Sequence, residues 1–139
     1  RRATHTPYTQ LVDGSTLEVF GTAVDQIAQA MGAAGKTAFA YRFDVQSGVP
    51  NLMSPHCMEL PFLFGNRADW ADARMVKDVA PAAFEQAGAQ LRCAVGAFVR
   101  EGAPRTVAGQ RWSDCSGATP RIAEFHEGGV RFHDHRPST

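Results

Sequence analysis

The chain has 139 residues, 44% of them hydrophobic, and a formal net charge of +0, so its size suits one globular domain, residues 1–139. A balanced charge offers no basic surface for nucleic acid or an anionic membrane, and we expect neither as a partner. We find no apolar run near the roughly 20 residues that a membrane helix needs, and we expect no signal peptide before the fold.

The first sixteen residues are polar and irregular, so we expect a free N-terminus there. Residues 17–34 follow with a pattern that predicts a helix, because apolar side chains recur every three or four positions. Ser15 or Thr16 can cap this helix, and Gly35 can end it. The repeating apolar residues are Leu17, Phe20, Val24, Ile27, Ala28 and Met31.

Residues 37–43 predict a strand that enters a sheet. Phe39, Tyr41 and Phe43 share one face, and smaller or mixed side chains share the other, as in a strand lying under helices in an α/β sheet. A loop over residues 45–55 follows and places His56 at its far end. A loop histidine just past a strand is well placed to act as a general base, although such a histidine is more often only exposed or hydrogen-bonded.

Residues 79–100 predict a long helix, which Asp78 can cap and Gly102 can end. Phe84, Leu91 and Phe98 recur every seven residues and form its apolar stripe. A short coiled-coil seam is the alternative interpretation of this stripe.

A β-hairpin is predicted near the end of the chain, where residues 121–126 and 130–134 flank Gly128-Gly129. In that register Phe125 lies opposite Phe132, and Glu124 lies opposite His133. We find no internal repeat and no second domain.

The three cysteines form an odd set, so they cannot all pair within the chain. Cys93 and Cys115 could form a disulfide, but three reduced thiols are the simpler expectation. Reduced thiols weakly favour a cytoplasmic location.

A family resemblance rests on residues 41–65, where Tyr41-Arg42-Phe43 is followed by a loop reading His-x-x-Glu-Leu-Pro-Phe-x-Phe-Gly. This segment resembles the histidine region of the type-B carboxylesterases, the para-nitrobenzyl esterase and cholinesterase-like branch of the α/β-hydrolases. The resemblance extends more weakly over residues 15–135. Cys57 departs from the family, which usually carries glycine or alanine at that position.

The resemblance implies an α/β fold, specifically the C-terminal fragment of an α/β-hydrolase: helix, strand, histidine loop, long helix and terminal hairpin. It also implies that His56 is the catalytic histidine of a serine-histidine-acid triad, that Glu59 is a supporting carboxylate, and that no cofactor is needed. The nucleophile should sit on a Gly-x-Ser-x-Gly elbow, and the sequence contains none. Because the family order is serine, acid, histidine, both partners should lie upstream of Arg1.

The same implication predicts a partner, because helices that cover a large sheet expose apolar faces when that sheet is absent. We expect the chain to pack with a missing N-terminal portion of the esterase or to self-associate. The intact enzyme would act on a small-molecule ester, and the chain alone would be inactive.

Three alternatives remain from the residues. Cys57 and His56 could form a cysteine-based catalyst, although adjacent residues of an extended segment point apart. His126, His133 and His135 could share one face of the hairpin and bind zinc, although a solvated, histidine-rich tail is the simpler explanation of these residues. Finally, the chain could be a noncatalytic interaction module with an esterase-like scaffold.

Overall fold

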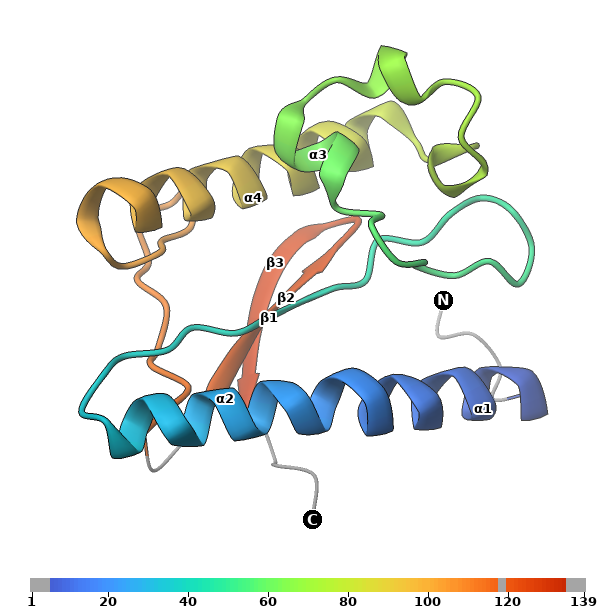
Figure 1. Ribbon diagram of the computed structural model, residues 1–139. Helices are drawn as coiled ribbons and strands as arrows, with labels where there is room; N and C mark the ends of the chain where they lie inside the picture. Colours follow the sequence, from blue (N-terminus) through green and yellow to red (C-terminus); the bar gives the residue numbers. More distant parts are fainter. Residues whose placement is uncertain (1–5, 118–119, 135–139) are drawn as a thin grey trace.

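The computed structural model describes residues 6–117 and 120–134 and shows a small sheet between helices (Figure 1). A long helical segment runs along one side of the sheet, and α4 and α3 cover the other side. This mixture confirms the α/β class. In chain order the elements are α1 (Pro7–Thr16), η1 (Leu17–Gly21), α2 (Thr22–Ala33), β1 (Tyr41–Phe43), α3 (Leu60–Phe64), η2 (Arg67–Trp70), η3 (Arg74–Val76), α4 (Pro81–Glu101), β2 (Arg121–His126) and β3 (Gly129–Asp134).

Together α1, η1 and α2 form one N-terminal helical segment, which begins ten residues earlier than the sequence predicted. The expected free, irregular segment up to residue 16 is therefore wrong for the part of it that the structure describes. Thr6 caps α1: its Oγ1 accepts a hydrogen bond from the Thr9 N–H at 3.2 Å, and Thr9 Oγ1 accepts one from the Thr6 N–H at 2.9 Å. Pro7 suits the first turn because its missing N–H has no partner there in any helix. Ser15 and Thr16 are therefore interior residues and not caps.

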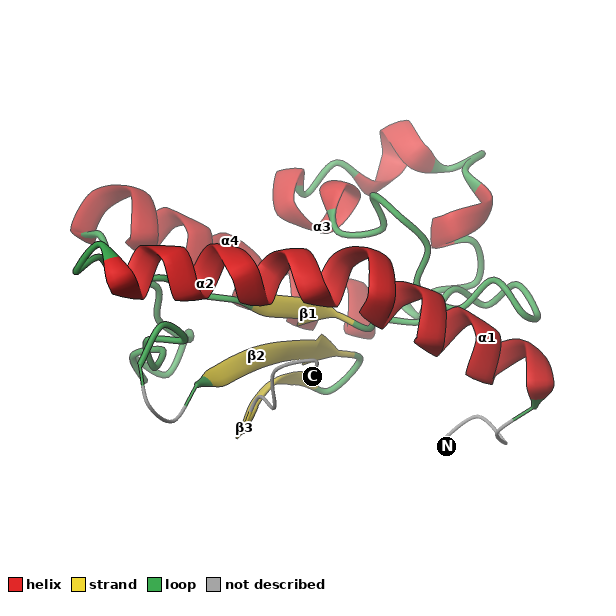
Figure 2. Ribbon diagram, turned by 60° about the horizontal axis from the view of Figure 1, so that its bottom comes forward, coloured by secondary structure: helices red, strands yellow, loops and turns green. Residues whose placement is uncertain are grey.

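Residues Leu17–Gly21 form η1, a π-helical stretch that joins α1 to α2 without a break (Figure 2). The wider π turn inserts extra backbone into the helix and changes the direction in which the next side chains point. Gly35 ends the segment as predicted, with a φ of +65°, which is a left-handed conformation that glycine adopts without strain.

The sheet has the order β1-β2-β3, with β1 parallel to β2 and β2 antiparallel to β3. The hairpin exists, but its predicted register is wrong by two residues: Phe125 lies opposite Val130, and Ala123 lies opposite Phe132. Gly129 belongs to β3 and pairs with His126, which leaves Glu127-Gly128 as the turn. A shift of two residues keeps every side chain on its predicted face.

The core lies between the sheet and α4. Phe62 of α3 stacks on Phe84 of α4 with ring centroids 4.2 Å apart, and Phe43 meets Phe62 edge to face. Phe84 and Leu91 of the α4 stripe pack against the sheet and α3, so the coiled-coil alternative is wrong, whereas Phe98 near the end of the helix is half exposed. Asp78 is not the cap of this helix, because Ala80 holds the cap position, whereas Gly102 ends α4 with a φ of +71° as predicted.

The N-terminal helical segment, by contrast, leaves most of its large apolar side chains in solvent. They are Tyr8, Leu11, Leu17, Val19, Phe20, Val24 and Ile27. All three cysteines are free, so Cys93 and Cys115 do not pair. Of the helices in the described segments, none is both long and apolar enough to span a lipid bilayer.

Candidate functional site

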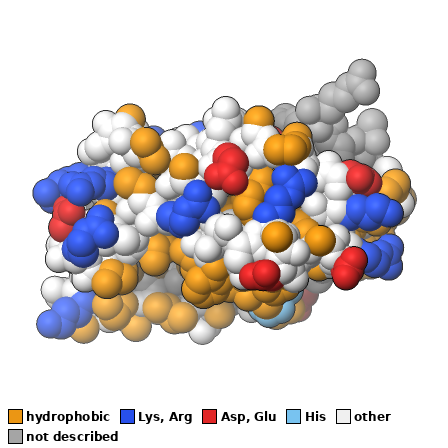
Figure 3. Space-filling model, turned by 90° about the horizontal axis from the view of Figure 1, so that it is seen from above, with side chains coloured by type: hydrophobic (Ala, Val, Ile, Leu, Met, Phe, Trp, Pro, Cys, Tyr) orange, Lys and Arg blue, Asp and Glu red, His pale blue; other side chains and the backbone are white. Residues whose placement is uncertain are grey.

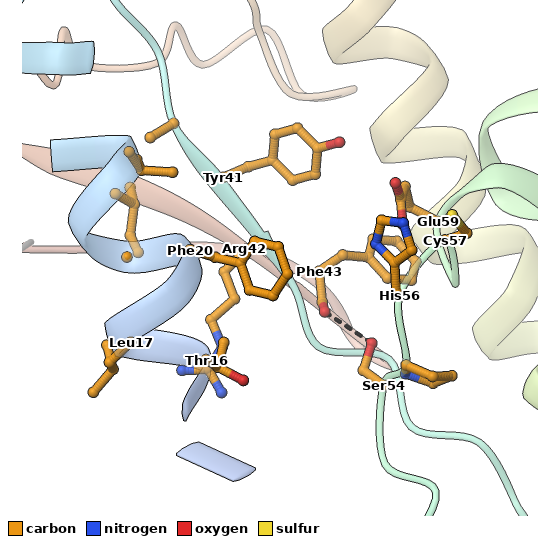
Figure 4. A pocket seen from close by; sticks show the side chains of 15 residues that line it. Thr16, Leu17, Phe20, Tyr41, Arg42, Phe43, Ser54, His56, Cys57 and Glu59 are labelled. Carbon is orange, nitrogen blue, oxygen red and sulfur yellow. Dashed lines mark hydrogen bonds between the residues drawn. The ribbon is translucent and has the colours of Figure 1, made fainter. Parts of the chain in front are cut away.

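The histidine loop starts at the end of β1 and is tied back to it. Ser54 Oγ donates a hydrogen bond to the carbonyl oxygen of Phe43 at 2.9 Å, which joins the last residue of the strand to the loop just before His56 (Figure 4). Val45 is fully buried and anchors the other limb of the loop. The loop is therefore held at both ends by the core, as a loop must be to aim a side chain.

His56 lies in the turn that follows, and its imidazole is exposed. Two features fix this turn: the Met58 N–H donates a hydrogen bond to the Pro55 carbonyl at 3.1 Å, and the Met58 side chain is fully buried. Phe62, in the next helical turn, is also fully buried. His56 is thus exposed on a turn whose following residues are anchored in the core.

The imidazole faces an open pocket of about 410 Å³. We call it the histidine pocket. One wall is the helical segment, the floor is β1, and the third side is the loop that carries His56 (Figure 4). Side chains from these three elements include Leu17, Phe20, Val24, Arg42, Ser54 and Glu59.

Glu59 is half-buried and lines the same pocket, with its carboxylate beside the imidazole of His56 in Figure 4. Among the described residues no hydrogen bond joins the two side chains. The Glu59 carboxylate does act on Tyr41: burial raises the pKa of the Tyr41 hydroxyl, and the nearby Glu59 carboxylate raises it further.

Cys57 has a φ of +65°, in the left-handed region that glycine adopts freely and other residues adopt at a cost. This explains a glycine at the matching position in the family that the segment resembles. Within the described part of the chain no hydrogen bond joins the Cys57 thiol to the His56 imidazole, so the structure gives no support to a cysteine-based catalyst.

The zinc alternative also finds no support. His126 pairs with Gly129 at the turn, whereas His133 lies opposite Ile122, further along the hairpin. The Nε2 of His133 lies 3.1 Å from a carboxylate oxygen of Glu124, whose other oxygen binds Arg131. The described residues contain no cluster of metal-binding side chains, and His135 lies outside them.

Two residues that support the site were missed from the sequence. One is Ser54, described above. The other is Arg92 of α4, whose Nη1 donates a hydrogen bond to the carbonyl oxygen of Phe62 at 2.7 Å and so fixes α3 to α4. Both contacts join residues more than ten positions apart, and neither leaves a local pattern in the sequence.

Comparison with known proteins gives a consistent fold. A carboxylesterase of Geobacillus stearothermophilus, EST55, matches 96% of the chain with a TM-score of 0.76 and 21% identity in its structure at pH 6.2. Its structure at pH 6.8 matches 89% of the chain with a TM-score of 0.71 and 24% identity. An esterase from anaerobic Clostridium hathewayi that can hydrolyse aliphatic aromatic polyesters matches 77% of the chain with a TM-score of 0.64 and 20% identity.

In sequence, the chain is 29% identical over 84 residues to a probable N-octanoylanthranilate hydrolase, AqdA2, of Rhodococcus erythropolis. Those residues make up 60% of the chain and 18% of the hydrolase. No protein-family model matches. The chain spans 27% of the length of the first Geobacillus structure. It therefore has the fold of part of a carboxylesterase, an α/β-hydrolase fold, and includes an exposed histidine at the end of a strand-anchored loop.

Proposed function

We propose that the chain is the histidine-bearing part of a carboxylic ester hydrolase of the serine-histidine-acid type. The observation that carries the proposal is the exposed imidazole of His56 beside an open pocket, on a loop tied to β1, in a chain that matches carboxylesterases in fold. The resemblance of residues 41–65 to type-B carboxylesterases supports the same assignment.

In the assembled enzyme, His56 takes the proton of a serine hydroxyl as the serine attacks the ester carbonyl. It then returns the proton to the leaving alcohol. The serine and the acid that orients the imidazole belong to polypeptide outside the 139 residues, upstream of Arg1. Glu59, which lines the same pocket, is the supporting carboxylate in this proposal. The substrate is a small-molecule ester, and no cofactor takes part.

The test compares two histidine substitutions in the assembled enzyme, the chain together with the polypeptide encoded upstream of Arg1. His56→Ala is expected to lower kcat for a nitrophenyl ester by about 10⁴-fold or more, because removing a triad histidine disables the nucleophile. His126→Ala, on the hairpin turn, is the matched control and should leave kcat within about twofold. Equal loss from both variants, or none from His56→Ala, would refute the assignment.

The chain alone provides a second test, since it has no serine elbow. It should not turn over the same ester at a rate above that of free imidazole. Triad-like turnover by the chain alone would contradict the proposal. An upstream polypeptide without a Gly-x-Ser-x-Gly elbow would instead support a noncatalytic, esterase-like interaction module.

A further inference from the structure

The segment that follows β1 continues the hydrogen-bonding pattern of the sheet beyond the strand itself. The Asp44 N–H donates to the Phe125 carbonyl at 2.7 Å, just past the last residue pair of β1 and β2. Bonds in a parallel ladder are evenly spaced and alternate residues point to the same neighbour, so the next N–H directed towards β2 is that of Gln46. Its partner in a longer β2 would be the main-chain carbonyl of Glu127.

The side chain of Glu127 takes the place of that carbonyl. Strand β2 ends at His126, and the main chain then turns towards β3. The Gln46 N–H donates instead to Glu127 Oε1, at 2.9 Å. A bond from a backbone N–H to a carboxylate is stronger than one to a neutral carbonyl. The Glu127 carboxylate thus extends the path of β1 into the first residues of the histidine loop.

A second bond joins this first limb of the loop to the limb that leads to His56. The N–H of Ser47, the residue after Gln46, donates to the Met53 carbonyl at 2.8 Å. Met53 directly precedes Ser54, and His56 lies two residues beyond Ser54. The position of the first limb therefore constrains the second limb and the backbone that carries the imidazole.

Glu127 can act on His56 only through this loop. It is not among the residues that line the histidine pocket. It lies 81 positions beyond Gln46 in the sequence, on the turn of the hairpin. Its side chain is exposed, so a substitution there removes the bond to Gln46 without opening a cavity in the core.

We propose that Glu127 is a positioning residue for His56: its carboxylate holds Gln46 and, through the bond between Ser47 and Met53, keeps the imidazole where a serine hydroxyl can reach it. This deepens the proposed function, on which it rests. The acceptor oxygen of Glu127 acts here, and its charge is not required. Without the bond the loop still carries His56 but holds it less precisely, and a misplacement of about 1 Å at a reacting group can cost roughly 100-fold in rate.

Turnover by the assembled enzyme tests the proposal with two substitutions at one position. Glu127→Ala removes the acceptor, so we expect kcat for a nitrophenyl ester to fall about tenfold while KM stays within about twofold, because the pocket is unchanged. Glu127→Gln keeps an acceptor oxygen and loses the charge, so it should retain kcat within about threefold. An unchanged kcat in Glu127→Ala, or an equal loss in both variants, would overturn the proposal.

Glu101→Ala is the matched control. Glu101 is an exposed residue at the end of α4, and its carboxylate lies 2.8 Å from the Arg105 guanidinium, so this variant also loses one charge-assisted contact. Acidic and basic side chains are spread over the face seen in Figure 3, so the loss of one charge changes such a surface little. We expect kcat within about twofold of the unsubstituted enzyme. A tenfold fall here as well would show a general effect of removing an exposed carboxylate and contradict the proposal.

Amide hydrogen exchange followed by NMR on the chain alone measures the bond without catalysis. In Glu127→Ala the amides of Gln46 and Ser47 should exchange about tenfold faster than in the unsubstituted chain. The Gly48 amide, which donates to the Lys77 carbonyl at 2.9 Å, is held by a different segment and should change far less. Unchanged exchange at Gln46 would overturn the proposal. Faster exchange at Gln46 alone would show that the constraint does not reach the second limb, and would overturn it too.

Failure of this inference and failure of the proposed function are distinguishable. If His56→Ala abolishes turnover but Glu127→Ala does not lower it, the hydrolase assignment holds and the positioning role fails. If His56→Ala leaves turnover unchanged, the proposed function fails and the positioning role fails with it, even where the exchange rates show that Glu127 holds the loop.

Discussion

The two helical sides of the sheet have similar sequence patterns and opposite surroundings. On α4, Phe84 and Leu91 are each 1% exposed, because the sheet and α3 cover them. On the N-terminal helical segment, Phe20 is 57% exposed and Ile27 is 63% exposed, although their spacing is just as regular. The comparison teaches that apolar periodicity identifies which face of a helix is suited to burial, but does not identify the element that buries it.

The energetic difference between the sides follows from the same observation. Burying one large aliphatic or aromatic side chain is worth about 1.5–3 kcal/mol. The α4 side already has this stabilisation, whereas the N-terminal side would gain it only when another polypeptide covers it. Substitutions on the two sides should therefore differ sharply in their effect on the stability of the chain alone.

The largest expected difference is between two phenylalanines. Phe84→Ala should lower the free energy of unfolding by about 3–5 kcal/mol, because it leaves a cavity in the core. Phe20→Ala, the matched exposed substitution, should change it by less than about 0.5 kcal/mol. Urea denaturation followed by circular dichroism measures both, and similar losses would show that the N-terminal helical segment is covered in the isolated chain.

The next effect concerns Arg92, which bonds the Phe62 carbonyl. Arg92→Ala should lower the free energy of unfolding by about 1–3 kcal/mol, because it leaves a partly buried acceptor without its donor. Arg100→Ala, an exposed arginine of the same helix, is the control and should have little effect. If the two variants denature alike, the tie between α3 and α4 does not contribute to stability.

A smaller effect, of opposite sign, is expected at Cys57. Cys57→Gly should raise the free energy of unfolding by up to about 1 kcal/mol, because glycine adopts the positive φ without steric cost. Cys93→Gly, inside α4, should lower it, because glycine disfavours a helix interior. Thermal denaturation of both variants decides the matter, and a lower melting temperature for Cys57→Gly would contradict the strain at that residue.

The smallest effect is a titration. Glu59→Gln removes a negative charge that disfavours tyrosinate, so it should lower the pKa of Tyr41 towards its ordinary value while leaving the part due to burial. Ultraviolet absorbance of tyrosinate in a Tyr8→Phe background reports Tyr41 alone. An unchanged titration midpoint would mean that the Glu59 carboxylate lies too far from the Tyr41 hydroxyl to affect its pKa.

The sequence predicted the fold class better than the ends of the elements. The α/β class was implied by the resemblance of residues 41–65, and the alternation in residues 37–43 agreed with it, although only Tyr41–Phe43 of that predicted strand pairs in the sheet. The start of the helical segment was wrong because Thr6 and Thr9 cap one another, a pair less distinctive than the usual threonine and glutamate. The hairpin register was wrong because adjacent glycines at 128 and 129 allow more than one turn.

The contacts that hold the site could not be predicted from local pattern. Ser54 bonds a carbonyl eleven positions earlier, and Arg92 bonds one thirty positions earlier. Such partners become visible only when the chain has folded, because many polar side chains could reach a given carbonyl. The roles of His56 and Glu59 stay predictions from the resemblance, whereas their shared pocket is a property of the fold.

The bond from Ser54 to Phe43 has a consequence for how such an enzyme would work. The bond joins the last residue of β1 to the segment just before the turn that carries His56, so a shift of the strand end would move the turn with it. If His56 serves a serine, a variant that loosens the end of β1 would displace the imidazole from that hydroxyl without changing either residue. Turnover would then depend on the position of the strand end as much as on the presence of His56.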